Sequence, residues 1–125
     1  MKTVLIVDDE LDIVEALKAI LEEERYKVVT CSNGREALQG LSETPPDLAI
    51  IDIMMPVMNG YETLKAIRQR PELQKLPVLM MSAIPPTMKS KDYAWAGFLK
   101  KPFSLNELLK HVHQLAPKDP DQESA

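Results

Sequence analysis

The sequence predicts an α/β fold: a doubly wound, five-stranded parallel sheet with five helices on its two faces. Short apolar runs of strand length alternate along the chain with segments whose apolar residues recur at helical spacing. The run Leu48–Ile51 is apolar throughout and leads into Asp52, which is typical of a central strand buried on both faces. Because crossovers between parallel strands are right-handed, the favoured strand order is 2-1-3-4-5.

The first half of the chain contains two strand–helix units ahead of the central strand. β-branched, apolar residues mark the strands, and apolar residues at spacings of four, seven and eight from Ile13 mark the first helix. Pro45 and Pro46 end the second helix. The predicted elements are a strand at 2–7, a helix at about 11–25, a strand at 27–31 and a helix through Ala37, Leu38 and Leu41.

The second half continues the alternation, with one weak element. This is the fourth helix, which Pro85 and Pro86 place at 87–96 in a shortened or irregular form. The other elements are a helix at 60–70 ended by Pro71, strands at 77–82 and 97–100, and a last helix at 105–115 that begins with the capping box Ser104–Glu107. We expect residues 1–116 to form one domain and the polar residues 117–125 to form a disordered tail.

Composition narrows the classes of function. The 125 residues suffice for one domain, and 45% hydrophobic with 27% charged residues is ordinary for a globular protein. The net charge of −4 argues against nucleic-acid binding, because phosphate contacts need clustered Lys and Arg. No apolar run approaches the roughly 20 residues that span a bilayer, and the first strand is too short for a signal peptide. The single cysteine, Cys31, fits a reducing compartment, so we expect a cytoplasmic protein.

Polar residues suited to chemistry occur at the ends of four predicted strands. They are Asp8 and Asp9 after the first strand, Asp52 at the end of the third, Ser82 at the end of the fourth and Lys101 after the fifth. The predicted strand order brings these ends to one edge of the sheet. Clustered carboxylates raise one another's pKa values, and Mg²⁺ would relieve that repulsion. A carboxylate nucleophile, a metal, a lysine and a hydroxyl are the groups needed to receive a phosphoryl group.

In these motifs the chain resembles the response-regulator receiver domain of two-component phosphorelay signalling, from Lys2 to about Leu115. The matching residues are Asp8-Asp9, Asp52 with Met54-Met55-Pro56 and Asn59-Gly60, Ser82-Ala83, and Lys101-Pro102-Phe103. Each pair alone is weak evidence, but the whole set in this order and at these strand ends is specific. The resemblance implies a flavodoxin-like receiver fold and a stand-alone, single-domain, phosphorylation-dependent switch.

The resemblance also implies a role for each site residue. Asp52 takes a phosphoryl group from a phosphohistidine on a partner histidine kinase or histidine phosphotransfer protein. Asp9, Asp52 and the backbone carbonyl of Met54 bind Mg²⁺, with Asp8 acting through water, and Lys101 pairs with the phosphoryl group. On this basis the chain is not an enzyme with a separate substrate. It catalyses only its own phosphotransfer and autodephosphorylation.

Further implications concern how the switch responds and what it contacts. Ser82 moves to hydrogen-bond the phosphoryl group, and Phe98, at the family's aromatic switch position, turns inward. The peptide bond before Pro102 is cis in the family. The face made by the fourth helix, fifth strand and fifth helix contacts a downstream protein, and the chain is a monomer or a phosphorylation-dependent dimer.

The sequence departs from the family pattern in two places. The spacing from Ser82 to Lys101 is a few residues shorter than is usual in the family, and the shortfall falls on the fourth helix. Met54 and Ile84 are apolar at the positions two after the phosphoacceptor and two after the switch hydroxyl, which border the path of the attacking water in the family. We therefore hypothesise slow autodephosphorylation.

Other interpretations of the same residues stay open at this point. Each aspartate alone could merely begin a turn or helix, and Phe98 could be an ordinary core residue. The chain could be a receiver-like module that does not accept phosphate and acts as a scaffold. It could also be a Mg²⁺-dependent hydrolase with an aspartyl-phosphate intermediate, although such enzymes typically carry a second Asp where this chain has Met54.

Overall fold

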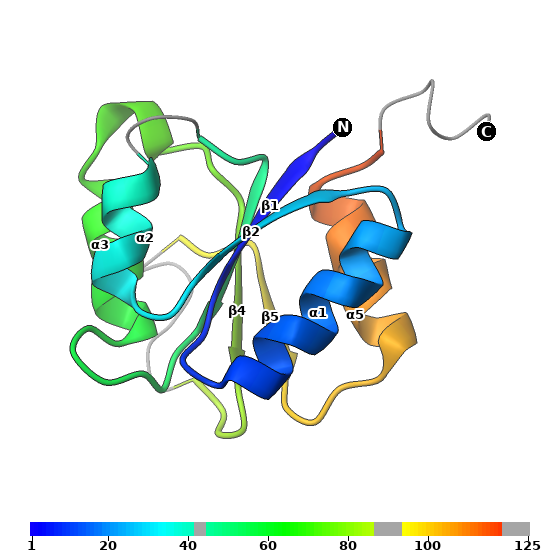
Figure 1. Ribbon diagram of the computed structural model, residues 1–125. Coiled ribbons are helices and arrows are strands. Elements are labelled where there is room, and N and C mark those ends of the chain that lie inside the picture. The colour runs from blue at the N-terminus through cyan, green and yellow to red at the C-terminus, as the bar shows by residue number, and fades with distance from the viewer. Residues whose placement is uncertain (42–44, 87–93, 119–125) are drawn as a thin grey trace.

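The computed structural model describes residues 1–41, 45–86 and 94–118, in which strands and helices alternate along the chain (Figure 1). The elements are β1 (Thr3–Val7), α1 (Leu11–Glu23), β2 (Lys27–Cys31), α2 (Gly34–Leu41), β3 (Leu48–Asp52), α3 (Gly60–Arg68), the 3₁₀ helix η1 (Pro71–Leu73), β4 (Val78–Ser82), β5 (Gly97–Lys100) and α5 (Leu105–Leu115). Within the described residues, no helix has the length and apolar character needed to cross a membrane.

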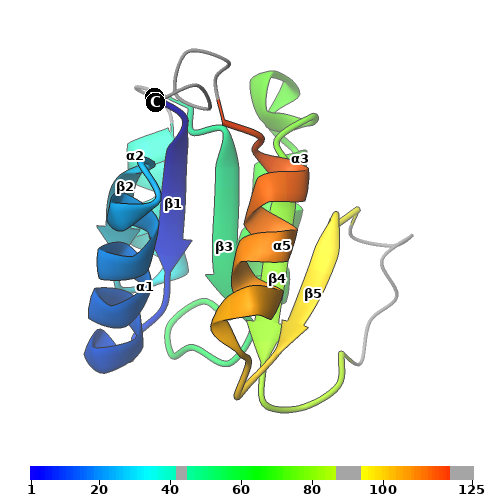
Figure 2. The same cartoon turned by 90° about the vertical axis from the view of Figure 1, so that its right-hand side faces the viewer.

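The five strands form one parallel sheet in the order β2-β1-β3-β4-β5, which confirms the predicted fold class and strand order. The central strand β3 is buried along its whole length, as the apolar run before Asp52 predicts. β2 and β5 are the edge strands, and Figure 2 shows β5 at the outer edge with α5 in front of the sheet.

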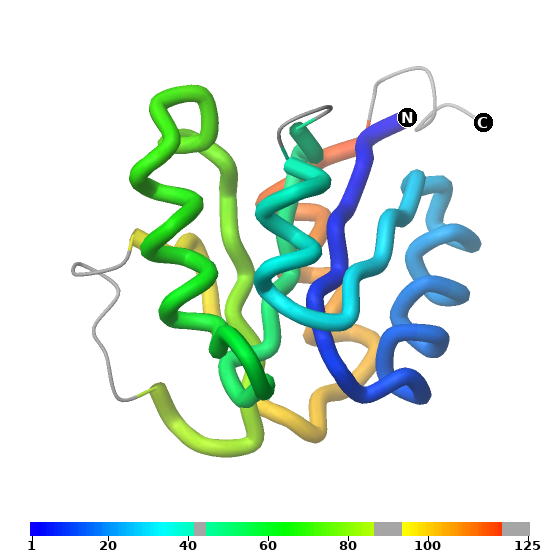
Figure 3. The backbone as a smooth tube through the Cα atoms, turned by 60° about the vertical axis from the view of Figure 1, so that its left-hand side comes forward, coloured from blue at the N-terminus to red at the C-terminus, as the bar shows by residue number. Residues whose placement is uncertain are grey.

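Helices cover both faces of the sheet and create two hydrophobic layers. Figure 1 shows α1 and α5 on one face and α2 and α3 on the other, and Figure 3 shows α2 and α3 side by side. Successive strand residues point to opposite faces, so in β1 Val4 and Ile6 pack toward α1 and α5 while Leu5 and Val7 pack toward α2 and α3. Both faces of the central strands β1, β3 and β4 are therefore largely apolar, and polar side chains follow at their ends.

Several element boundaries differ from those predicted. The first helix ends at Glu23 rather than near Arg25, because Arg25 has φ 68°, outside the right-handed helical region. The helix at 60–70 ends at Arg68, and Pro71 begins a 3₁₀ turn that the sequence analysis did not predict. The predicted fourth helix lies mostly outside the described residues. Of its residues, 94–96 are described and are not helical.

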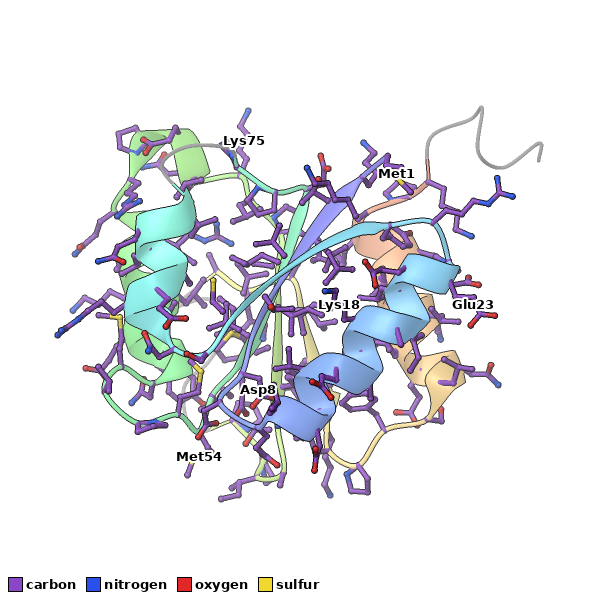
Figure 4. All side chains as sticks on the ribbon, viewed as in Figure 1. Met1, Asp8, Lys18, Glu23, Met54 and Lys75 are labelled. Atoms are coloured by element: carbon purple, nitrogen blue, oxygen red, sulfur yellow. The ribbon has the colours of Figure 1, made fainter. Side chains whose placement is uncertain are left out.

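The two ends of the sheet carry different groups. Figure 4 shows Asp8 and Met54 at one end and Met1 and Lys75 at the other. All five strands are parallel, so their C-terminal ends meet at the edge that carries Asp8. The predicted tail lies outside the described residues from 119 onward.

Candidate functional site

Lys101 lies at the centre of an ion cluster at the C-terminal edge of the sheet. Its Nζ is 3.0 Å from Asp8 Oδ2, 3.4 Å from Asp52 Oδ1 and 3.5 Å from Glu10 Oε1. Asp8 follows β1, Asp52 ends β3 and Lys101 follows β5. Residues from distant parts of the chain thus meet because the parallel strands end at one edge.

The two aspartates of the cluster are buried, whereas Glu10 is largely exposed. Asp8 and Asp52 are each 2% exposed, and the Lys101 side chain is 13% exposed. Asp8 uses both carboxylate oxygens, because Oδ1 accepts a hydrogen bond from the Glu10 N–H at 2.9 Å and Oδ2 accepts from Lys101. Buried charges are costly unless they are paired, so Lys101 stabilises both aspartates at this edge.

The cluster shifts the acid–base properties of its members. Burial and the negative charge of Asp8 raise the pKa of Asp52 to about 6, although Lys101 and a hydrogen bond from the Met54 backbone N–H act in the opposite direction. Burial lowers the pKa of Lys101, but its hydrogen bond to Asp8 and the charges of the three carboxylates outweigh burial and raise that pKa. Lys101 is therefore a cation at neutral pH, while Asp52 carries a charge that its surroundings disfavour.

The donor set of the cluster fits a hard divalent cation such as Mg²⁺. Carboxylate oxygens of Asp8, Glu10 and Asp52 all lie within 4.8 Å of one another, and oxygen donors of this kind are the usual protein ligands of Mg²⁺. The single Lys101 ammonium does not neutralise the three carboxylates, so a bound cation would also compensate their excess negative charge. Asp9, the expected direct ligand, is exposed, is not one of these three and lines a neighbouring pocket of about 280 Å³ with Asp8.

The loop after β3 returns close to the backbone of Asp52. A Cβ atom at Gly60 would lie 2.6 Å from the Asp52 carbonyl oxygen and 2.7 Å from Ile53 Cα. The Gly60 N–H donates to the Ile53 carbonyl at 2.9 Å, and Asn59 and Glu62 form a complete capping box at the start of α3. The absence of a side chain at Gly60 thus lets α3 begin directly against the backbone of Asp52.

The remaining predicted site residues lie on β4 and β5. Ser82 ends β4, is 2% exposed and accepts a hydrogen bond on Oγ from the Ile84 N–H at 3.1 Å. Its carbonyl accepts from the Lys101 N–H at 2.9 Å. Phe98 lies in β5 opposite Met80 and packs, half-buried, against the α2 and α3 layer. The structure therefore connects Ser82 to Lys101 through the backbone.

The peptide bond between Lys101 and Pro102 is cis, as the family resemblance implies. Beside it, an open groove of about 530 Å³ runs between α1 and the loop after β5. Glu10 and Lys101 are among its lining residues, together with the apolar side chains of Ile13, Ile20 and Phe103. The ion cluster is thus accessible from this side of the molecule.

The sequence between residues 4 and 113 matches the family model of the response regulator receiver domain. The chain belongs to this family. It is 44% identical over 119 residues to the response regulator GtcR of Aneurinibacillus migulanus, covering 89% of this chain and 46% of GtcR. The chain therefore spans about half the length of this curated relative.

Solved receiver structures share the fold. The chemotaxis protein CheY4 of Vibrio cholerae has a TM-score of 0.86 and 35% identity, covering 92% of this chain and 98% of that chain. The response regulator TrrA of Thermotoga maritima, solved in complex with Mg²⁺ and BeF, has a TM-score of 0.83 and 34% identity, covering 92% of this chain and 99% of that chain. The receiver fold predicted from the sequence is thus confirmed.

Sequence reasoning missed one member of this receiver's ion cluster, Glu10. It stands next to the Asp8-Asp9 pair but occupies the N-cap position of α1, from which its side chain reaches a lysine 91 residues away. The acidic run Asp8-Asp9-Glu10 was visible in the sequence. However, the direction of each side chain depends on where β1 ends and α1 begins.

Proposed function

We propose that this receiver is a phosphoacceptor switch, in which Asp52 accepts a phosphoryl group from a phosphohistidine of a histidine kinase or histidine phosphotransfer protein. The observation that supports this most directly is the ion pair between the buried Asp52 and Lys101, inside a cluster of carboxylates at the strand ends. A buried carboxylate with a purely structural role would be expected to have a cation that neutralises its charge. Here burial, together with the negative charge of Asp8, raises the pKa of Asp52 to about 6, which suits a group that exchanges partners.

The transfer follows from the positions of Asp52 and Lys101. A carboxylate oxygen of Asp52 attacks the phosphorus, the P–N bond to the donor imidazole breaks, and its electron pair stays on the departing nitrogen. Lys101, 3.4 Å from Asp52 Oδ1, stabilises the negative charge on the transferred oxygens. Mg²⁺, when bound, would further stabilise the negative charge of the phosphoryl group. We propose that Asp9, Asp52 and the Met54 carbonyl would hold the ion, with Asp8 acting through water. Asp9 is exposed and is not one of the three clustered carboxylates, so its side chain would have to turn toward Asp52 to do so.

The response to phosphorylation is proposed to pass through Ser82 and Phe98. Ser82 lies one residue beyond Met81, the β4 partner of Asp52, and its own β5 partner is Lys100. A shift of Ser82 toward the phosphoryl group would therefore act on β5, which carries Phe98. We propose that β5, α5 and the segment before β5 form the face that contacts a downstream protein, or a second copy in a phosphorylation-dependent dimer.

We also propose that the phosphoryl group on Asp52 is long-lived. Met54 and Ile84 are 60% and 54% exposed, and both are apolar. Ile84 has no hydrogen-bonding group and the sulfur of Met54 is only a weak acceptor, so these two positions give little help in orienting a water for hydrolysis. A phosphoryl half-life of seconds in the presence of Mg²⁺ would contradict this proposal.

The proposed unit is residues 1–116, which contain all the helices and strands found in the described part of the chain. We place it in the cytoplasm, where Cys31 would stay reduced. Because the chain spans about half of GtcR, the kinase and the downstream partner are not assigned from that relative.

Intact mass spectrometry tests the proposed function. The protein is incubated with acetyl phosphate, with and without Mg²⁺, beside Asp52→Asn and the matched control Asp12→Asn, an exposed carboxylate on α1. We expect a mass gain of one phosphoryl group that requires Mg²⁺, persists in Asp12→Asn and is absent in Asp52→Asn. No adduct in the wild-type protein under any condition would favour the scaffold function instead.

A further inference from the structure

Glu10 is placed unusually for the N-cap residue of a helix. N-cap side chains commonly accept hydrogen bonds from the free N–H groups of the first turn, but Glu10 makes no such bond to α1. Its carboxylate instead lies 3.5 Å from Lys101 Nζ, although the Glu10 side chain is 59% exposed. The side chain therefore extends toward the ion cluster rather than toward its own helix.

Lys101 faces three carboxylates, and they differ in strength of contact. Asp8 is buried and closest, at 3.0 Å, and Asp52 is the proposed phosphoacceptor itself. Glu10 has the longest contact and the greatest exposure. A phosphoryl group on Asp52 can take over the contact that Asp52 makes with Lys101. Because an ammonium has only three donor hydrogens, a second bond from Lys101 to the phosphoryl group must displace Asp8 or Glu10. Glu10 is the partner whose displacement costs least, because water can solvate its carboxylate.

We infer that Glu10 is a positioning residue that holds the Lys101 ammonium until a phosphoryl group displaces it, and that its charge favours cation binding over anion binding at this site. The inference rests on the proposed function and adds a residue to it. In the unphosphorylated protein Glu10 contributes negative charge that attracts Mg²⁺. In the phosphorylated protein the same charge competes with the phosphoryl oxygens for Lys101.

If Glu10 has this role, removal of its negative charge should change the affinity for Mg²⁺ and the affinity for a phosphoryl analogue in opposite directions. Glu10→Gln keeps the shape and length of the side chain but removes one negative charge. Mg²⁺ binding should weaken, because one attractive charge is lost, whereas an anionic phosphoryl analogue should bind more tightly, because Lys101 has one competitor fewer. A merely structural role at the start of α1 would weaken both affinities or change neither.

Two calorimetric titrations test the inference on the wild-type protein, Glu10→Gln and Asp12→Asn. The control removes the same charge from the first turn of α1 at an exposed residue that is not one of the three carboxylates around Lys101. The first titration measures Mg²⁺ affinity, and the second measures beryllofluoride affinity at saturating Mg²⁺. For Glu10→Gln we expect Mg²⁺ affinity to fall about fivefold and beryllofluoride affinity to rise about threefold, the size expected for a partly exposed ion pair.

The outcomes separate the two proposals. If wild-type protein captures beryllofluoride but Glu10→Gln matches Asp12→Asn in both titrations, or loses affinity in both, the role of Glu10 is wrong and the phosphoacceptor function stands. If the wild-type protein captures no beryllofluoride with Mg²⁺, the proposed function itself fails, and the role of Glu10 with it. Opposite changes in the two affinities, confined to Glu10→Gln, support the inference.

Discussion

At the C-terminal edge of the sheet one lysine faces three carboxylates. At the opposite end, the polar groups that join α5 to the α1–β2 turn include a carboxylate with two basic partners and a hydroxyl bonded to a carbonyl. There the Tyr26 hydroxyl donates to the Ala116 carbonyl at 2.7 Å. Glu24 contacts His113 at 3.3 Å and Lys118 at 3.5 Å. The same sheet thus carries a crowded, negatively charged edge and an end whose polar contacts hold elements together.

The difference indicates how the fold divides stability and function. Unbalanced carboxylates lower the stability of the folded protein until a cation or another ligand compensates them. Paired groups far from the cluster stabilise the fold without depending on a ligand. Removal of a charged or polar group should therefore stabilise the protein in the carboxylate cluster and destabilise it at the opposite end, and only the former should affect phosphorylation.

The largest expected effect is at Gly60, beside the proposed phosphoacceptor. In Gly60→Ala the new Cβ would meet the Asp52 carbonyl and Ile53 Cα, both backbone atoms that cannot move aside easily. We expect the free energy of unfolding, measured in urea, to fall by about 3 kcal/mol. Gly40→Ala is the control: nothing lies within 4 Å of its Cβ in α2, so it should gain about 0.5–1 kcal/mol. Equal stabilities for the two variants would contradict the close approach at Gly60.

The second expected effect is a gain in stability, for Asp52→Asn. The raised pKa of Asp52, about 6 against an ordinary 3.8, means that the folded protein holds a proton that the unfolded chain loses between these two pH values. Stability therefore falls as pH rises through that window. In EDTA at pH 7, Asp52→Asn should be more stable than wild type by about 2 kcal/mol. This advantage should disappear by about pH 4.

Thermal unfolding across pH measures this difference, with Asp12→Asn as the control. That control should track the wild-type curve within about 0.5 kcal/mol, because exposed carboxylates contribute little. A wild-type protein as stable as Asp52→Asn at pH 7 would show that the cluster is not electrostatically strained.

A smaller loss of stability is expected for a substitution at the opposite end of the sheet. Tyr26→Phe removes the hydroxyl and leaves the Ala116 carbonyl without that donor, which should cost about 1 kcal/mol in urea unfolding. Because Tyr26 is distant from the cluster, the rate of phosphorylation by acetyl phosphate should stay unchanged. A loss of phosphorylation in the folded variant would mean that the two ends are coupled.

The smallest effect is expected for Glu24→Gln. Its contacts with His113 and Lys118 are partly exposed, so the variant should lose at most about 0.5 kcal/mol at low salt. Salt screens such pairs, so unfolding at high salt should give the two proteins the same stability. A loss that persists at high salt would show that Glu24 acts by packing rather than by charge.

Much of the fold was predictable because apolar runs of strand length specify a buried parallel sheet. The order β2-β1-β3-β4-β5 then brought Asp8, Asp52 and Lys101 together as expected. The contribution of Glu10 was not predictable, because it depends on a contact across 91 residues and on the conformation at the start of α1. The early end of α1 depends on the positive φ of Arg25, which a non-glycine residue does not signal.

The most direct test of the account is to locate the phosphoryl group after reaction with acetyl phosphate and Mg²⁺. Borohydride reduction converts an aspartyl phosphate to homoserine, and peptide mapping by mass spectrometry identifies the converted residue. We expect conversion at Asp52 alone and none at Asp8 or Asp9. Conversion at another carboxylate, or no conversion in protein that binds Mg²⁺, would contradict the assignment of Asp52 as the phosphoacceptor.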